Sequence, residues 1–185
     1  PWNLSRLAET ILFLISKNTS DAIKVVEEIL FDFDKNFNNS LDILSSHKLG
    51  FKNNSKKTSS LYSKLLNLME AGKADFTGTF KSLKATLIKE DDTIFLNNFR
   101  NSDEENQHVV SQWLGNWRKL LQENSKSKTE ANELLVSSNP EFIMRNHLVE
   151  QAIGKATKGD FSDFDILRDL LITPFEVKEN HETFY

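Results

Sequence analysis

Apolar residues recur at three- and four-residue intervals through the first 50 positions, the spacing of a helix with one buried face. A first helix can begin at the cap residue Asn3 and end near Ser16. A second can begin within 19–21, a Thr-Ser-Asp run, and end near Leu44 or Leu49, where Gly50 suits a C-cap. The apolar positions of the two helices are Leu4, Leu7, Ala8, Ile11, Leu14 and Ile15, then Ile23, Val26, Ile29, Leu30, Phe33 and Phe37.

The next two helices are separated by polar segments. Residues 52–60 contain no apolar side chain, so we expect an exposed loop that Thr58 or Ser59 closes by capping the following helix. That helix stops at Gly72, and Asp75 can cap a shorter one. Residues 89–101 fit either a short helix or an ordered loop. The apolar positions are Leu61, Leu65, Leu68 and Met69, then Phe76, Phe80 and Leu83.

The most strongly amphipathic stretch follows a capping-box pattern formed by Ser102 and Glu105. Trp113 and Trp117 lie one turn apart on its apolar stripe, which favours core packing over a platform for stacking a ligand. A polar linker over 124–130 then leads to a short helix that ends at Val136. The stripe consists of Val109, Val110, Trp113, Leu114, Trp117, Leu120 and Leu121.

Two further helices are expected before the C-terminus. Asn139 and Pro140 favour a helix start, because Asn caps well and Pro suits the first helical position, and the helix runs to Lys158. In the last helix Ser162 and Asp165 form a capping pair, and Phe161 can pack on Ile166 across the cap. Pro174 ends this helix.

The composition agrees with an all-α fold. Only 6 Gly and 3 Pro occur among 185 residues, whereas 14 Phe and 3 Trp supply material for a core. We therefore predict a multi-helix bundle that forms a single helical unit.

Charge, apolar run length and the lack of cysteine exclude several classes of protein. The net charge is −4 with acids and bases interspersed, so we expect no nucleic-acid partner. The apolar run Ile11–Ile15 is too short to cross a bilayer, and no basic segment precedes it as in a signal peptide, so we expect no membrane partner. Without cysteine, no disulfide, thiolate zinc site or cysteine nucleophile can form.

No motif for kinase-type chemistry is present. Such a site needs a Gly-rich loop, a phosphate-binding Lys and metal-binding acids, and no such loop occurs. Asp75-Phe76-Thr77-Gly78 resembles the Asp-Phe-Gly metal element with one extra residue, and a helix cap with a buried aromatic side chain is the favoured interpretation. We predict no catalytic, cofactor-binding or metal-binding residue. The remaining candidates have other expected roles: scattered surface or partner-facing histidines (His47, His108, His147, His181) and helix-capping acids (Asp91, Asp92, Glu104, Glu105).

Arg145 and Asn146 are the candidate sites for a polar contact. Both fall on the apolar face of the helix expected after Pro140. Burying an unpaired guanidinium is costly, so Arg145 should meet a carboxylate or carbonyls, within this chain or on another part of the protein. A polar tie between helices is favoured over contact with a substrate or nucleotide, and it predicts a folding defect for Arg145→Ala.

Four blocks resemble the C-terminal region of the selenoprotein O family, also called the YdiU family. They are Trp-Asn-Leu-Ser-Arg-Leu-Ala at 2–8, His-Lys-Leu-Gly at 47–50, Ala-Asp-Phe-Thr-Gly-Thr-Phe-Lys-Ser-Leu at 74–83, and the segment 139–175. The last is the most specific, with Asn-Pro, Arg-Asn, Gln-Ala-Ile, Gly-Asp-Phe and Pro-Phe in the family's order. The resemblance covers nearly the whole sequence, apart from the loops around Asn53 and Lys126.

This resemblance implies a kinase-like protein adenylyltransferase, which transfers AMP from ATP to protein Ser, Thr or Tyr hydroxyls with Mg²⁺ or Mn²⁺. In that family the nucleotide-binding, catalytic and metal-binding residues lie upstream of the Trp-Asn-Leu block, so none is carried onto this sequence. The family's redox-active C-terminal cysteine or selenocysteine is also unmatched here. Residues 1–51 would end the kinase-like C-lobe and 58–185 would form a helical extension, as a fragment of a longer intracellular protein from a bacterial cytoplasm or a mitochondrion.

We therefore expect a structural C-terminal part of a protein adenylyltransferase, without catalysis by these residues alone. Its expected partners are the upstream kinase-like lobe and the protein substrates of the parent. The alternative is a helical protein-interaction or regulatory module. A contiguous exposed apolar patch would fit such a module, and it would equally fit the surface that contacts the upstream lobe. An independent helical enzyme is disfavoured because no catalytic constellation is visible.

Overall fold

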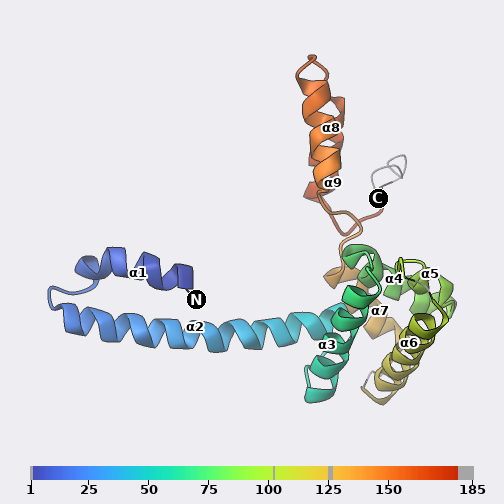
Figure 1. The fold of residues 1–185 in the computed structure, drawn as a ribbon, viewed down its shortest axis with the longest axis horizontal. Helices are drawn as coiled ribbons and strands as arrows, with labels where there is room; N and C mark the ends of the chain where they lie inside the picture. The colour runs from blue at the N-terminus through green and yellow to red at the C-terminus, as the bar shows by residue number, and fades with distance from the viewer. Residues whose placement is uncertain (1, 102, 125–126, 179–185) are drawn as a thin grey trace. The chain divides into compact units, whose positions relative to one another are not determined.

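A computed structural model of the chain describes residues 2–101, 103–124 and 127–178, and within these ranges helices are the only regular elements (Figure 1). The predicted all-α class is confirmed. The chain divides into two compact units, Pro1–Leu44 and Ser45–Tyr185. The helices are α1 (Trp2–Ile15), α2 (Thr19–Lys48), α3 (Lys56–Ala71), α4 (Phe76–Lys89), α5 (Thr93–Leu96), α6 (Glu104–Asn124), α7 (Lys128–Ser138), α8 (Asn146–Ala156) and α9 (Ser162–Ile172).

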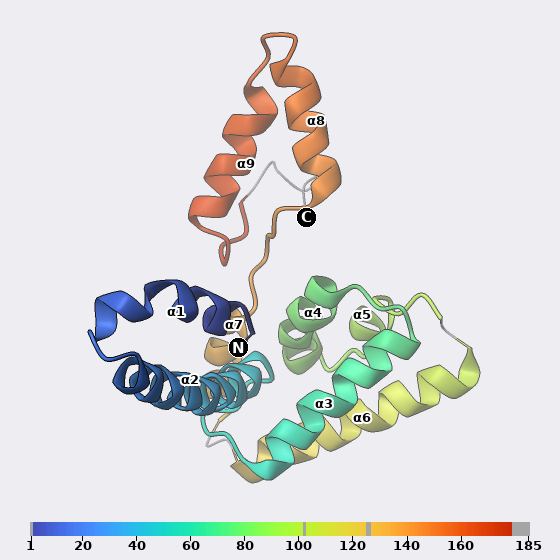
Figure 2. The ribbon, with the colours of Figure 1, turned by 60° about the vertical axis from the view of Figure 1, so that its left-hand side comes forward.

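The first unit consists of α1 and most of α2, and both helices lie where the apolar spacing predicted them. Asn3 is not the cap of α1, because the helix begins at Trp2 and includes Asn3. A short turn reverses the chain between the two helices, so that α1 folds back along α2 (Figures 1 and 2). Among the described residues of this unit only Ala22 is buried, and sixteen large apolar side chains are exposed. This unit therefore has very little core of its own.

The core of the second unit is built around α6. Figure 2 shows α3 and α6 lying side by side, and the apolar stripe of α6 packs against α3, α5 and the start of this unit. Trp113 and Trp117 are buried in the core, as predicted, and their rings stack on each other. Their indole N–H groups donate to the carbonyl oxygens of Leu61 and Leu49, each at 2.9 Å. Buried indoles need such acceptors, so these two bonds specify how α6 sits against its neighbours.

The helix starts on either side of Gly72 follow from their caps. α3 begins earlier than predicted because Ser55, and not Thr58 or Ser59, is the N-cap: its hydroxyl accepts the N–H of Thr58, whose own hydroxyl accepts the N–H of Ser55. Gly72 ends α3 and Asp75 caps α4, both as predicted. The aromatic residue after Asp75 was expected to be buried, and this is wrong: Phe76 is half exposed, whereas Phe80 one turn later is buried.

The segments around α6 were only partly predictable. Residues 89–101, for which the sequence allowed either a short helix or a loop, contain the single helical turn α5. Ser102 lies outside the described residues, and Asp103 accepts the N–H of Asn106 at the start of α6. The linker that follows is shorter than expected, since Ser127 caps α7 and α7 continues to Ser138.

The helix expected from Pro140 begins six residues later, at Asn146. Proline disfavours helical dihedrals at the residue before it, and Asn139 is accordingly extended and forms the C-cap of α7. The next two backbone N–H groups, of Glu141 and Phe142, donate to the carbonyl oxygen of Pro174 at 2.8 and 3.1 Å, so they leave the helical pattern.

The two ends of the α8–α9 hairpin also differ in part from the prediction. Ser162 is the first residue of α9 and not its cap, and its N–H donates to Asp160. α8 stops at Ala156, and the chain turns through Gly159, which has a φ of 87°. Pro174 follows the end of α9, as predicted.

Replacing the buried indole of α6 tests how strongly this core depends on its hydrogen bond. Trp117→Phe leaves the Leu49 carbonyl oxygen without its donor in the core, so the free energy of unfolding should fall by about 1–3 kcal/mol in urea titrations followed by circular dichroism. The control is Trp2→Phe at an exposed position, which should change it by less than about 0.5 kcal/mol. Equal changes in both variants would contradict this account.

Candidate functional site

The predicted polar residue Arg145 forms an ion pair with Asp75, seventy residues away in the sequence. Its Nη1 and Nη2 lie 2.8 and 3.1 Å from the two carboxylate oxygens of Asp75. Asp75 also caps α4, because its Oδ1 accepts the N–H of Gly78 at 2.6 Å. One carboxylate therefore joins the N-terminus of α4 to the N-terminus of α8.

The interaction between Asp75 and Arg145 shifts the pKa of both side chains. Hydrogen bonds from Arg145 hold the pKa of Asp75 below its ordinary value, and the N–H of Gly78 acts in the same direction. The same hydrogen bonds raise the pKa of Arg145. Both side chains are more than a third exposed, at 37% and 38%, so solvent screens the pair and its contribution to stability is modest.

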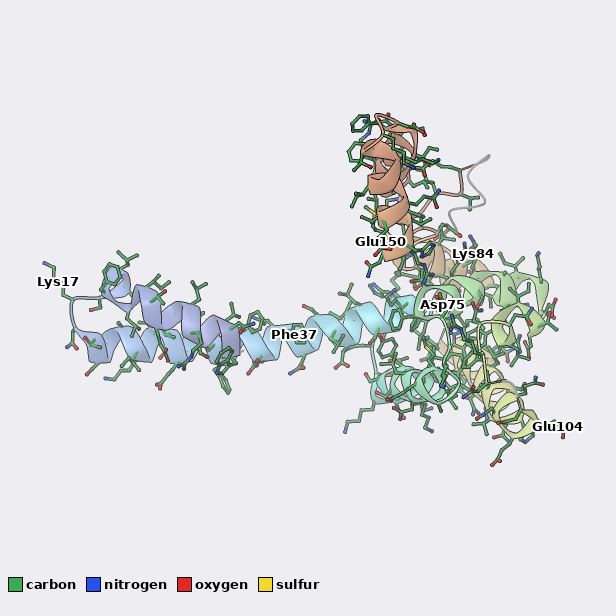
Figure 3. All side chains as sticks on the ribbon, turned by 45° about the horizontal axis from the view of Figure 1, so that its top comes forward. Lys17, Phe37, Asp75, Lys84, Glu104 and Glu150 are labelled. Carbon is green, nitrogen blue, oxygen red and sulfur yellow. The ribbon has the colours of Figure 1, made fainter. Side chains whose placement is uncertain are left out.

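A second carboxylate fastens the extended segment 139–145 to α4. Glu141 is buried and pairs with Lys84 and, at 3.4 Å, with Lys81. Lys81 also reaches the Glu141 carbonyl oxygen at 3.4 Å. Asp75 precedes α4 as its N-cap and Lys84 lies within the helix, and Figure 3 labels both residues. We call the five residues Asp75, Lys81, Lys84, Glu141 and Arg145 the α4 junction.

The environment of Arg145 and Asn146 differs from the expectation. Neither lies on a buried helix face, since Arg145 is the extended N-cap residue of α8 and Asn146 is its exposed first residue. A role of either residue toward another part of the protein stays a prediction. Sequence reasoning missed Asp75 as the partner and Glu141 as the second anchor. The cap motif made Asp75 visible, but nothing local pairs it with a residue so far along the chain.

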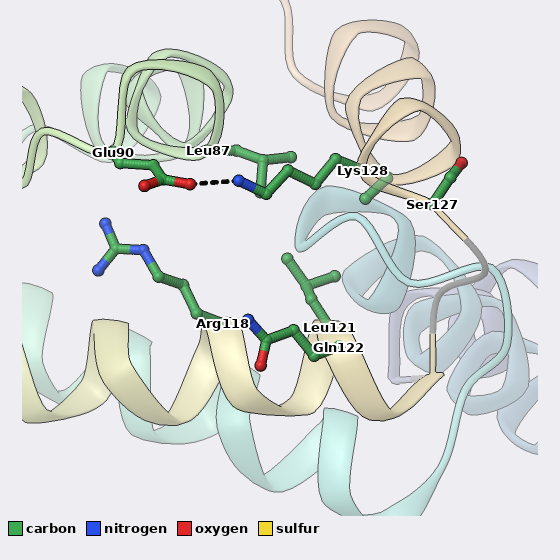
Figure 4. A pocket seen from close by; sticks show the side chains of 8 residues that line it. Leu87, Glu90, Arg118, Leu121, Gln122, Ser127 and Lys128 are labelled. Carbon is green, nitrogen blue, oxygen red and sulfur yellow. Dashed lines mark hydrogen bonds and ion pairs between the residues drawn. The ribbon is translucent and has the colours of Figure 1, made fainter.

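A cavity of about 270 Å³ lies between the end of α4, α6 and the start of α7 (Figure 4). Its cations are already neutralised, because Arg118 pairs with Asp92 and Lys128 pairs with Glu90. The rest of its described lining is apolar or amide and hydroxyl side chains, apart from the Glu90 carboxylate, which Lys128 neutralises. Within that lining no activated nucleophile or free base is present. This cavity is therefore better explained as a packing gap between helices than as a binding or catalytic site.

The other candidates also have local roles. His47 lies 3.3 Å from the Lys52 carbonyl oxygen, His108 contacts Gln112 and His147 is exposed, whereas His181 lies outside the described residues. In the described part of the chain, no three His, Cys, Asp or Glu side chains gather to hold a metal ion. Over the same residues, no helix is long and apolar enough to cross a membrane.

A double-mutant cycle measures the coupling free energy between Asp75 and Arg145 in the α4 junction. Asp75→Asn keeps a good cap residue and removes the charge, and Arg145→Gln removes the other charge. We expect a coupling free energy of about 0.5–1 kcal/mol at neutral pH from urea titrations. The control cycle uses the exposed pair of Arg6 and Glu9, where about 0.3 kcal/mol is expected. A coupling for Asp75 and Arg145 no larger than in the control would contradict the bidentate geometry.

The same pair should depend on pH. Because the folded-state pKa of Asp75 is lowered, its stabilisation is complete above the ordinary value of 3.8 and is lost as the pH falls through the lowered pKa. The stability difference between the wild type and Asp75→Asn should therefore shrink below about pH 4. It should vary much less with pH in the Arg145→Gln background, and an unchanged pH dependence there would assign the shift to other groups.

Comparison with known proteins places the chain in a family. The sequence model of the family described as "Protein adenylyltransferase SelO" matches residues 1–171. Similar proteins described as "Protein nucleotidyltransferase YdiU" include those of Rhizobium meliloti strain 1021, with 35% identity over 185 residues, Clostridium perfringens strain ATCC 13124, with 34% over 184, and Bacillus cereus strain AH187, with 30% over 184.

Each match covers 99% of this chain but only 37%, 35% and 36% of the respective relative. The chain thus spans little more than a third of the length of these relatives. The resemblance that the four sequence blocks indicated is confirmed. The chain belongs to the SelO family of protein adenylyltransferases.

Proposed function

We propose that this chain is a structural part of a protein that transfers AMP from ATP to hydroxyl side chains of other proteins. The residues that bind ATP and a divalent metal, Mg²⁺ or Mn²⁺, would lie in the remaining part of that protein, upstream of residue 1. Family membership supports the activity, and the short coverage of the relatives supports the division of labour.

The observation that carries this proposal is the exposed apolar surface of α1 and α2. Two helices cannot bury sixteen large apolar side chains between them, and soluble proteins rarely leave so much apolar surface in water. Phe13 in α1 and Phe31 in α2 are the most exposed large apolar side chains of these helices, each about three quarters exposed. A contact with the upstream region would cover such side chains, as expected if residues 1–51 complete a kinase-like lobe.

The α4 junction suits a scaffold role as well. Its acids and bases neutralise one another, and their geometry fastens segments instead of presenting reactive groups. The extension would then serve as a preformed helical support for the catalytic lobe.

An interaction module is the second candidate, and one feature favours it. An almost entirely apolar groove of about 550 Å³ runs between α8 and α9, rimmed by exposed side chains such as Ile153, Phe161 and Phe164. A groove of this kind fits a partner protein and requires no catalysis.

The proposal is tested with ATP labelled on its α-phosphate. The 185-residue chain alone, with Mg²⁺ or Mn²⁺ and a protein acceptor, should incorporate no label, whereas the parent protein including its upstream region should label the acceptor. Labelling by the chain alone would overturn the scaffold role. A parent protein that binds no ATP would leave the interaction module as the better account.

A pair of variants tests the apolar contact. Phe13→Asp with Phe31→Asp should change the stability of the chain alone by less than about 0.5 kcal/mol, because both positions are exposed. In the parent protein the same pair should lower both stability and AMP transfer. The matched control is Asn36→Asp with Asn38→Asp, which adds the same charge at exposed polar positions of α2. Equal effects of the two pairs in the parent would contradict the contact.

A further inference from the structure

A groove of about 510 Å³ runs along the outer side of the α3 and α6 pair and is lined by four lysines. Lys56, Lys57 and Lys64 come from α3, and Lys119 comes from α6. Glu123 is the acidic residue that lines it, and it lies 3.5 Å from Lys57 in an exposed pair. The chain as a whole has a net charge of −4, so this groove is a local reversal of sign.

Three of these lysines make no ion pair with any residue that the structure describes. They are Lys56, Lys64 and Lys119, and all three are exposed. Elsewhere in the unit, Lys84 pairs with Glu141 and Arg118 pairs with Asp92, whereas Lys48 donates to the Ser138 carbonyl oxygen and the Asn139 amide oxygen. A row of unpaired like charges is mutually repulsive, so an anionic partner would relieve it.

The groove continues beyond the lysines along the same two helices. An adjoining hollow of about 360 Å³ shares Lys64, Trp113 and Asn116 with it and adds the amides of Asn67 and Gln112. Along α3, Lys56 and Lys64 are eight residues apart, a rise of about 12 Å. On one face of an extended peptide, side chains repeat about every 7 Å, so acidic residues at successive positions on that face can reach both lysines.

From this arrangement we propose that the α3–α6 groove binds an acidic, extended polypeptide segment, with the three lysines receiving carboxylates and the amides receiving backbone groups. The lining favours a polypeptide over a nucleic acid. Its described lining contains no arginine that could bind a phosphate in a bidentate manner. Trp113 is buried between Phe95 and Trp117, so its ring offers no face on which a base could stack.

Binding of an acidic segment here does not depend on AMP transfer or on the contact made by α1 and α2. The groove lies wholly within the second unit, and none of its lysines belongs to the α4 junction.

The test uses fluorescence anisotropy of a labelled oligoglutamate peptide with the 185-residue chain at low ionic strength. The wild type should bind it, an oligoglutamine peptide should not bind, and added salt should weaken binding because the contacts are exposed. The triple variant Lys56→Gln, Lys64→Gln and Lys119→Gln should bind about tenfold more weakly, since each exposed contact contributes a little and three are lost.

The control variant is Lys17→Gln, Lys24→Gln and Lys158→Gln, which removes the same charge from exposed positions outside the groove. It should change the affinity less than about twofold. Circular dichroism should show both variants folded, and amide shifts caused by the peptide should map to α3 and α6.

Several results would overturn the proposal: equal losses in the two variants, no binding of oligoglutamate by the wild type, or shifts that map elsewhere. A single-stranded oligonucleotide that binds through the same lysines more tightly than oligoglutamate would overturn the assigned chemistry.

Discussion

Burial of the two α6 indoles is the constraint on which the larger unit depends. An indole contributes much apolar area, but its N–H must find an acceptor once water is excluded. Trp117 finds it at Leu49, just after α2, and Trp113 finds it at Leu61 in α3. The two bonds tie segments that are 68 and 52 residues away from the tryptophans, and the stacked ring of Phe95 adds α5 to the same cluster.

The α4 junction fastens the extended segment 139–145, which leads into α8, to the core of the second unit. α4 is anchored in the core by Phe80 and Leu83. Its N-cap Asp75 and its Lys84 pair with Arg145 and Glu141 of the extended segment 139–145. The hairpin of α8 and α9 has a small cluster of its own around Phe142 and Leu167. Charged groups here act at modest strength because most are partly exposed, and the buried carboxylate of Glu141 is tolerated because two lysines meet it.

The first unit, in contrast, has regular helices but almost no core. Its helices are regular and amphipathic, yet they leave their apolar side chains in solvent. Helix formation is local, whereas burial needs a partner surface, so the same sequence pattern can form a helix without forming a core. This separation is why family membership and the exposed surface of α1 and α2 together favour a scaffold that completes a larger protein.

Local sequence determined the all-α class, the positions of α1, α2 and α6, the stop at Gly72 and the cap at Asp75, because apolar spacing and capping act within a few residues. It also carried the family resemblance, in blocks that need no fold to be seen. Only the tertiary structure decided that Arg145 meets Asp75 and that Glu141 and Phe142 turn toward Pro174 instead of starting a helix. It also decided that three lysines without an ion pair among the described residues gather in one groove. Those outcomes depend on which segments, far apart in the sequence, the core brings together. Local propensities act within a few residues and cannot specify such contacts.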